Sequence, residues 1–326
     1  MKATFAKYII TAVSTVFILT ACTERINIAT GQSEEMLMVY AKLSNDRSDQ
    51  NIILKRTKDY FDPEFKNDFL GGAEMKVYTE SGKVYNMVEL DSSPGTYSPY
   101  DDEGNAIAME IEPGEILLEM TISEEIYPAT AGDYLISETV PERVTLDSVV
   151  VENTKTLGLD SYNLYIYAQD PPGEKNYYCL WLKIEYAEGE PAYYYGNSIM
   201  KYILIDDFGV DGEYMEKRSI ATYPSGKYNT SGTNMYSGIP YLSPSDRITV
   251  TMGSISEGYY KFLSQCQSVK NGTNPFFGGP LSNIYSNIPG GAGYFTGYCT
   301  SSATTVVPAA VNNCGDRPIK LFCTEI

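Results

Sequence analysis

Histidine is absent from the 326 residues of this chain. Because histidine is the commonest general base in enzymes, its absence excludes a Ser-His-Asp or Cys-His nucleophile, and the commonest zinc ligand is missing as well. No other catalytic motif stands out, so the sequence predicts a protein that is not an enzyme and has no catalytic residue, cofactor or metal site. A glycosidase with paired carboxylates needs no histidine and stays open, although 42 acidic residues make chance pairs inevitable.

Basic residues are scarce. The chain has 24 lysines and arginines against 42 acidic residues, which gives a formal net charge of −18. Such a protein repels the phosphates of nucleic acid and anionic lipid headgroups, so we expect neither as a partner. Colloidal solubility is the simplest reason for the acidity.

A hydrophobic run long enough to cross a membrane is missing from the N-terminus. Tyr8–Leu19 is a largely apolar run of 12 residues, whereas a membrane-spanning helix needs about 20. The run follows two lysines and ends in Leu19-Thr20-Ala21-Cys22, which resembles the bacterial lipobox. The sequence therefore predicts a lipoprotein signal peptide over residues 1–21 and acyl chains on Cys22, which hold the protein on a membrane. An ordinary signal peptide with a chance cysteine is the alternative.

Cysteines are few, and their number after Cys22 is odd: Cys179, Cys266, Cys299, Cys314 and Cys323. Export to an oxidising compartment permits disulfides, and the last four cysteines allow three pairings. We expect a disulfide between Cys314 and Cys323 and a free Cys179.

Tryptophan occurs once, against 29 tyrosines. Alternating, tyrosine-rich segments are typical of β-strands and of contact surfaces. Residues 22–35 are polar and predict a lipidated tether. Two series of short alternating strands follow, divided near Pro141-Glu142. They predict a mainly β fold with two β-sandwich-like (Ig-like) domains, over residues 36–141 and 142–326.

One helix is predicted near residues 255–269 of the second domain. Ser254 and Glu257 have capping-box spacing. An apolar stripe at helical spacing follows, made of Tyr259, Phe262, Leu263, Cys266 and Val269. In the strand predicted over residues 176–186, one face is apolar at one end only, at Tyr177, Cys179 and Trp181. We expect the helix stripe to pack in the core and to cover that end.

Two kinds of segment are candidates for ligand binding. Tyr193, Tyr194 and Tyr195 form an aromatic run that suits sugars or peptides, although half-buried strand tyrosines explain it equally well. The acidic segments 101–105 and 206–211 lack the spacing of an EF-hand loop, so we expect exposed turns and leave calcium open.

Several motifs in one order resemble a known family. They are the lipobox, Asp170-Pro-Pro-Gly-Glu-Lys-Asn-Tyr-Tyr178, Tyr259-Tyr-Lys-Phe-Leu263, Asn274-Pro-Phe276 and Ser286-Asn-Ile-Pro-Gly-Gly-Ala-Gly-Tyr-Phe295. Together they are similar to the Bacteroidota lipoprotein family known as domain of unknown function 4249. The resemblance covers nearly the whole mature chain, and the cysteines after residue 298 look like a local addition. By themselves, the proline and glycine motifs predict turns and tight backbone paths.

The resemblance implies a β-rich lipoprotein of the outer membrane, without an established activity and frequently encoded near TonB-dependent receptors. The expected function is therefore to assist such a receptor in nutrient capture or import, with the membrane and the receptor as partners. A structural adhesin or envelope-assembly subunit is the alternative. Whether the protein faces the periplasm or the cell surface stays open, as does its ligand, whether a small molecule, a glycan or a peptide.

Overall fold

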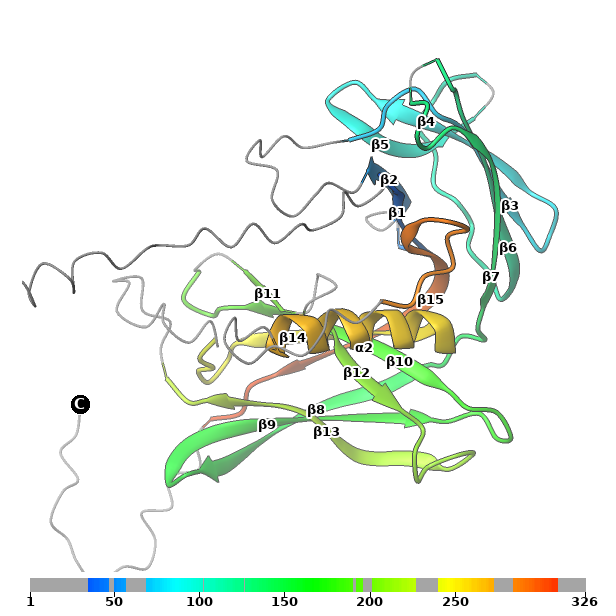
Figure 1. Cartoon of the computed structure of the whole chain (residues 1–326). Coiled ribbons are helices and arrows are strands. Elements are labelled where there is room, and N and C mark those ends of the chain that lie inside the picture. Colours follow the sequence, from blue (N-terminus) through cyan, green and yellow to red (C-terminus); the bar gives the residue numbers. More distant parts are fainter. Residues whose placement is uncertain are drawn as a thin grey trace, which may run out of the picture.

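The computed structural model describes residues 35–46, 50–56, 69–101, 103–125, 127–189, 192–195, 201–226, 240–272 and 284–309. These residues form strands β1 to β15 and one helix, α2 (Figure 1). The predicted fold class, mainly β with sandwich-like packing and one packed helix, is confirmed. Within the described ranges, no helix is long and apolar enough to cross a membrane.

The strands fall into two groups along the chain. The first group is β1 (Leu37–Ser44), β2 (Gln50–Arg56), β3 (Glu74–Thr79), β4 (Val84–Leu90), β5 (Ser93–Tyr100), β6 (Gly114–Ile122) and β7 (Gly132–Val140). The second is β8 (Leu146–Thr156), β9 (Leu159–Gln169), β10 (Tyr177–Glu185), β11 (Tyr193–Tyr195), β12 (Ile203–Asp206), β13 (Tyr214–Pro224), β14 (Arg247–Ile255) and β15 (Ala292–Val306), with α2 (Glu257–Gly272) between β14 and β15.

A single large sheet runs through both groups, in the order β11-β10-β14-β15-β1-β2-β5-β4-β3-β6-β7, with β12 also paired to β10. β15 makes this continuity. Its first half is parallel to β1, from Met38 beside Ala292 onward, and its second half is antiparallel to β14 as far as Val306. The division at residues 141 and 142 stays a prediction, to which the structure adds that the last strand pairs with both groups.

Three hydrophobic cores result. The first core lies within the curved sheet of β1 to β7 and includes Phe295 and Cys299 of β15. The second core lies between the three-stranded sheet β13-β9-β8 and the inner face of β10 and β14, so this half is a sandwich. The third, here called the helix core, lies between α2 and the other face of β10 and β15. Figure 1 shows α2 across β10 and β14, with β8, β9 and β13 as the layer below.

The helix core confirms the prediction that the helix covers the apolar end of β10. Cys179 is buried there with Tyr259, Phe262, Leu263 and Cys266 of the helix, and Tyr177 and Trp181 pack against them. Most of the contacts are aromatic, with ring centroids 5.4 Å apart for Tyr259–Tyr294 and 5.7 Å for Trp181–Tyr202. Burial raises the pKa of the Tyr259 phenol well above its ordinary value, because the charged form would lack solvent.

The glycine-rich segment before β15 brings this strand against β1. Gly293 has φ +90°, and a Cβ atom there would lie 1.9 Å from the carbonyl oxygen of Val39. On the other side, the Asn287 side chain accepts from the Phe295 N–H at 3.0 Å and donates to the Phe295 carbonyl at 2.8 Å, as a neighbouring strand would. The tight backbone path predicted from these glycines is confirmed.

We expect Gly293→Ala to destabilise the protein strongly. A side chain at positive φ costs about 1–2 kcal/mol, and the collision with Val39 adds about 1–3 kcal/mol. The matched control is Gly290→Ala, because Gly290 also has positive φ but nothing lies within 4 Å of its Cβ position. Urea denaturation of both variants gives the two losses in the free energy of unfolding. Equal losses would contradict the close approach of β15 to β1.

Candidate binding groove

A groove with a volume of about 390 Å³ lies where the two groups of strands meet. Three segments line it: residues 139–142 at the end of β7, residues 171–178 in the loop before β10 and at its start, and residues 254–257 at the junction of β14 and α2. Its size falls within the range of roughly 300–1,000 Å³ that is typical of small-molecule sites. The middle segment is the Asp170–Tyr178 motif singled out in the sequence.

The motif forms a rigid loop. Pro171 and Pro172 have restricted φ angles, and Gly173 takes φ +87°, so the predicted turn is confirmed. With its amide nitrogen turned toward the loop, Asn176 donates to the carbonyls of Pro171 and Glu174, at 3.1 and 3.2 Å. Asn176 therefore closes the turn.

Three aspartates clamp this loop to the segment between β12 and β13. Asp170 Oδ2 accepts from the Gly212 N–H at 3.1 Å. Asp207 Oδ2 accepts from the Asn176 N–H at 2.7 Å, and Asp211 Oδ1 accepts from the Gly173 N–H at 2.8 Å. Because charge-assisted hydrogen bonds are the strong ones, these contacts hold the groove wall in one conformation.

The same carboxylates are the described residues that could ligate a cation, since one oxygen of each lies within 4.8 Å of the others. Calcium takes six to eight oxygen ligands, and each carboxylate here already accepts a backbone N–H. The arrangement therefore functions as a clamp between loops. Sequence reasoning noticed the segment 206–211 but expected an exposed turn, which is wrong for Asp207, since that side chain is buried.

Asp170 is the most buried of the three, with 0% exposure. Its Oδ1 atom accepts from the Tyr178 hydroxyl at 2.6 Å. Burial and this hydrogen bond raise the pKa of Tyr178, because ionisation would place a second negative charge beside Asp170. The pair connects the loop to the second core, in which Tyr178 is fully buried.

The helix wall of the groove corrects one prediction. Ser254 does not cap the helix, because β14 continues to Ile255 and the Ser254 hydroxyl accepts from the Val144 N–H at 3.1 Å. Ser256 is the capping residue, and its hydroxyl accepts from the Tyr259 N–H at 3.1 Å. Glu257 is thus the first helical residue and faces the groove.

A model of the family described as domain of unknown function, DUF4249, matches residues 23–304. The chain belongs to the DUF4249 family. The resemblance seen in the sequence motifs is therefore confirmed. No curated protein matches the chain.

The tyrosine run of this DUF4249 protein lies away from the groove. Tyr193–Tyr195 form β11, which pairs with Leu182–Ile184 at the end of β10, whereas the groove contacts its beginning at Tyr177. Tyr193 packs against the second core, and Tyr194 is 52% exposed. The structure does not bring these residues to the groove, and their part in ligand binding stays a prediction.

Three of the six cysteines lie among the residues that the structure describes, and three lie outside them. Cys179, Cys266 and Cys299 are buried and form no disulfide within the described residues, and burial raises the pKa of the Cys266 and Cys299 thiols. Cys266 lies in the helix core and Cys299 in the first core, so they do not pair with each other. Cys22, Cys314 and Cys323 lie outside the described residues, and their lipidation and disulfide stay predictions.

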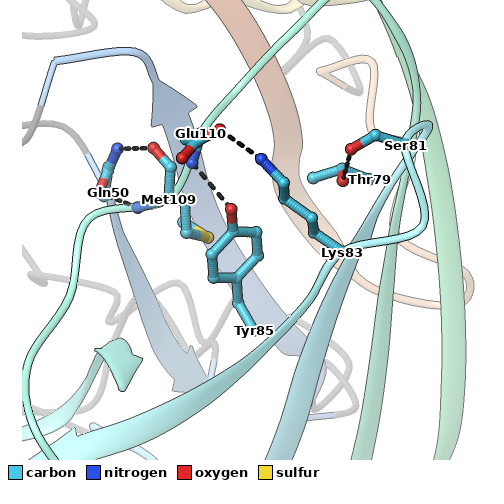
Figure 2. A network of polar contacts seen from close by, with 7 residues as sticks. All are labelled: Gln50, Thr79, Ser81, Lys83, Tyr85, Met109 and Glu110. Carbon is cyan, nitrogen blue, oxygen red and sulfur yellow. Dashed lines mark hydrogen bonds and ion pairs between the residues drawn. The ribbon is translucent and has the colours of Figure 1, made fainter. Parts of the chain in front are cut away.

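A second hollow of about 270 Å³ lies beside β4 and includes Lys83 and Tyr85. Figure 2 shows its surroundings: Lys83 pairs with Glu110, and the Tyr85 hydroxyl accepts from the Glu110 N–H at 3.0 Å. The buried Gln50 side chain donates to the Met109 carbonyl at 2.8 Å and accepts from its N–H at 2.9 Å. These contacts fasten the segment before β6 to the sheet, which is a structural role.

The acidic loop at residues 101–105 is stabilised by hydrogen bonds within the loop. Asp101 Oδ1 accepts from the N–H groups of Asn105 and Glu103, at 2.7 and 3.1 Å. The hydrogen bonds from Asn105, followed by those from Glu103, lower the pKa of Asp101. The loop matches the expected exposed turn.

We expect Asp170→Asn to lower the free energy of unfolding by about 2–4 kcal/mol, because the new amide cannot accept both buried hydrogen bonds. The control is Asp211→Asn, where the carboxylate is exposed and the loss should stay below about 1 kcal/mol. Urea denaturation measures both. A small loss for Asp170→Asn would show that the clamp does not hold the groove wall.

Proposed function

We propose that this DUF4249 protein is a non-enzymatic lipoprotein of the bacterial outer membrane, which assists a TonB-dependent receptor in capturing or importing a nutrient. One observation carries the proposal. The family match starts at residue 23, directly after Cys22 of the lipobox. The region shared by the family therefore begins where the mature chain would continue after cleavage by a signal peptidase and acylation of Cys22.

The groove supports a binding role. Prolines, two tyrosines and carboxylates line its walls, and two buried aspartates hold the proline loop by accepting hydrogen bonds from backbone N–H groups. A preformed, rigid wall binds without paying for ordering on association, which favours affinity. A tether over residues 22–35 would present this groove near the membrane. The lipid anchor would then hold a ligand-binding surface beside a receptor.

We expect Cys22→Ala to abolish both incorporation of labelled palmitate and retention in the membrane fraction, because the acyl chains supply the anchor. The double variant Cys314→Ser, Cys323→Ser is the control, since it removes two thiols and leaves the lipobox intact. Labelling that persists in Cys22→Ala would refute the anchor.

Crosslinking in cells tests the receptor. The full-length protein, purified by affinity after crosslinking, is expected to retain a TonB-dependent receptor, and Cys22→Ala is expected to retain far less. Recovery of adhesin or assembly subunits without a receptor would overturn the receptor role and favour the structural alternative.

A further inference from the structure

The groove is strongly acidic for its size. Glu142, Glu174 and Glu257 line it from three different segments, and all three are exposed to solvent within or beside it. Among the ion pairs of the described residues, none uses any of these three carboxylates. Glu142 and Glu174 are therefore available to a ligand, whereas Glu257 accepts a hydrogen bond from the Tyr177 hydroxyl and offers its second oxygen.

The positive charge in the groove is smaller than the negative charge of the three glutamates. Lys175 is the one basic residue among the lining side chains, and the N-terminus of α2 adds roughly half an elementary charge. Against three carboxylates, this leaves a net charge of about −1.5, and the whole chain has a net charge of −18. The negative charge of the groove and that of the whole chain therefore both disfavour an anionic ligand.

An aromatic surface lies within this acidic lining. Tyr177 is half-buried in the groove wall, and its ring centroid is 4.8 Å from that of Tyr260. Burial raises the pKa of Tyr177, followed by the negative charge of Glu257, the hydrogen bond to that carboxylate, and the charges of Asp207 and Asp206. Aromatic faces attract cations, and adjacent carboxylates strengthen the effect.

Further apolar lining comes from Pro141, Pro171 and Pro172, together with Ile255. Apolar rings beside carboxylates fit a ligand with a hydrocarbon portion and a charged end, as in an arginine or lysine side chain. An inorganic cation would make no use of the proline and tyrosine surfaces. A neutral glycan would make no use of the net charge.

We propose that the groove binds an organic cation, the guanidinium or ammonium group of a basic peptide or of a free amine. The inference rests on the proposed binding function and names the ligand class of that site. Glu142, Glu174 and Glu257 would pair with the charged group, and Tyr177 would contact it through its ring.

Calorimetric titration of the full-length protein in detergent tests this with three probes. They are N-acetyl-arginine amide, the capped tripeptide Ala-Arg-Ala, and the same tripeptide with citrulline, which has the shape of arginine without its charge. We expect the arginine tripeptide to bind at least about tenfold more tightly than the citrulline one, with affinity that falls as salt rises. Equal binding of the capped amino acid would show that the cationic side chain is sufficient and would point to a small organic cation as the natural ligand, whereas tighter binding of the tripeptide would point to a peptide.

Substitutions locate the binding. Glu257→Gln should weaken the arginine tripeptide about two- to fivefold, the effect of one partly exposed charge pair, and replacement of all three glutamates by glutamine should remove the preference over citrulline. Tyr177→Phe should retain binding and Tyr177→Leu should weaken it. Glu124→Gln is the matched control, because Glu124 is exposed at the opposite end of β7 from the groove. Unchanged denaturation midpoints would show that the variants fold.

Equal affinity for arginine and citrulline probes would overturn the inference, as would no detectable binding of either, or binding of a neutral oligosaccharide instead. These outcomes are distinct from failure of the proposed function, because lipidation and receptor crosslinking are measured without the probes. A lipidated, receptor-bound protein that ignores arginine would refute the ligand class alone.

Discussion

The structure depends on the pairing of β15 with two partners. Its first half completes the first sheet against β1, and its second half completes the sandwich against β14. Tyr294 of the same strand donates to Glu138 of β7 at 2.5 Å, which connects the helix core to the first sheet. Without β15, the two groups of strands would share no ladder, and the groove between them would lose its defined width.

The groove inherits its geometry from this junction. One wall follows β7, one is the start of α2, and the third is the proline loop before β10. Two of these walls are anchored by the sheet itself, because β14 and β7 end there. The third is a loop as far as Asn176 and reaches the sheet only at the start of β10, and aspartates restrain the loop by accepting hydrogen bonds from backbone N–H groups. Rigidity at the site is thus distributed between a shared sheet and a set of side chains.

The sequence predicted local features well. Alternation identified most strands, because half-buried strands repeat every two residues, and the stripe from Tyr259 to Cys266 identified the helix and the face that it covers. The extent of β15 was not predicted, because most of its residues after Tyr298 are small and polar. Its parallel pairing with β1 carries no local signal. The aspartate clamp was missed for the same reason: Asp170 and Asp207 are separated in the sequence by the strands β10, β11 and β12, and only the fold brings them together. The helix cap was misplaced because Ser254 and Ser256 are equally plausible without knowledge of where β14 ends.

The pairing of β1 with β15 also has a consequence for the order in which the protein folds. Thr300 donates to Asn45 at 2.7 Å across 255 positions of the chain. Contacts of such separation form late and slowly, since a long loop must close before any of them is gained. The large sheet therefore closes only after β15, its last strand in the sequence, is available to pair with β1 and β14. Until then the two groups of strands can fold only as separate units, so we expect their joining to be the slow step of folding.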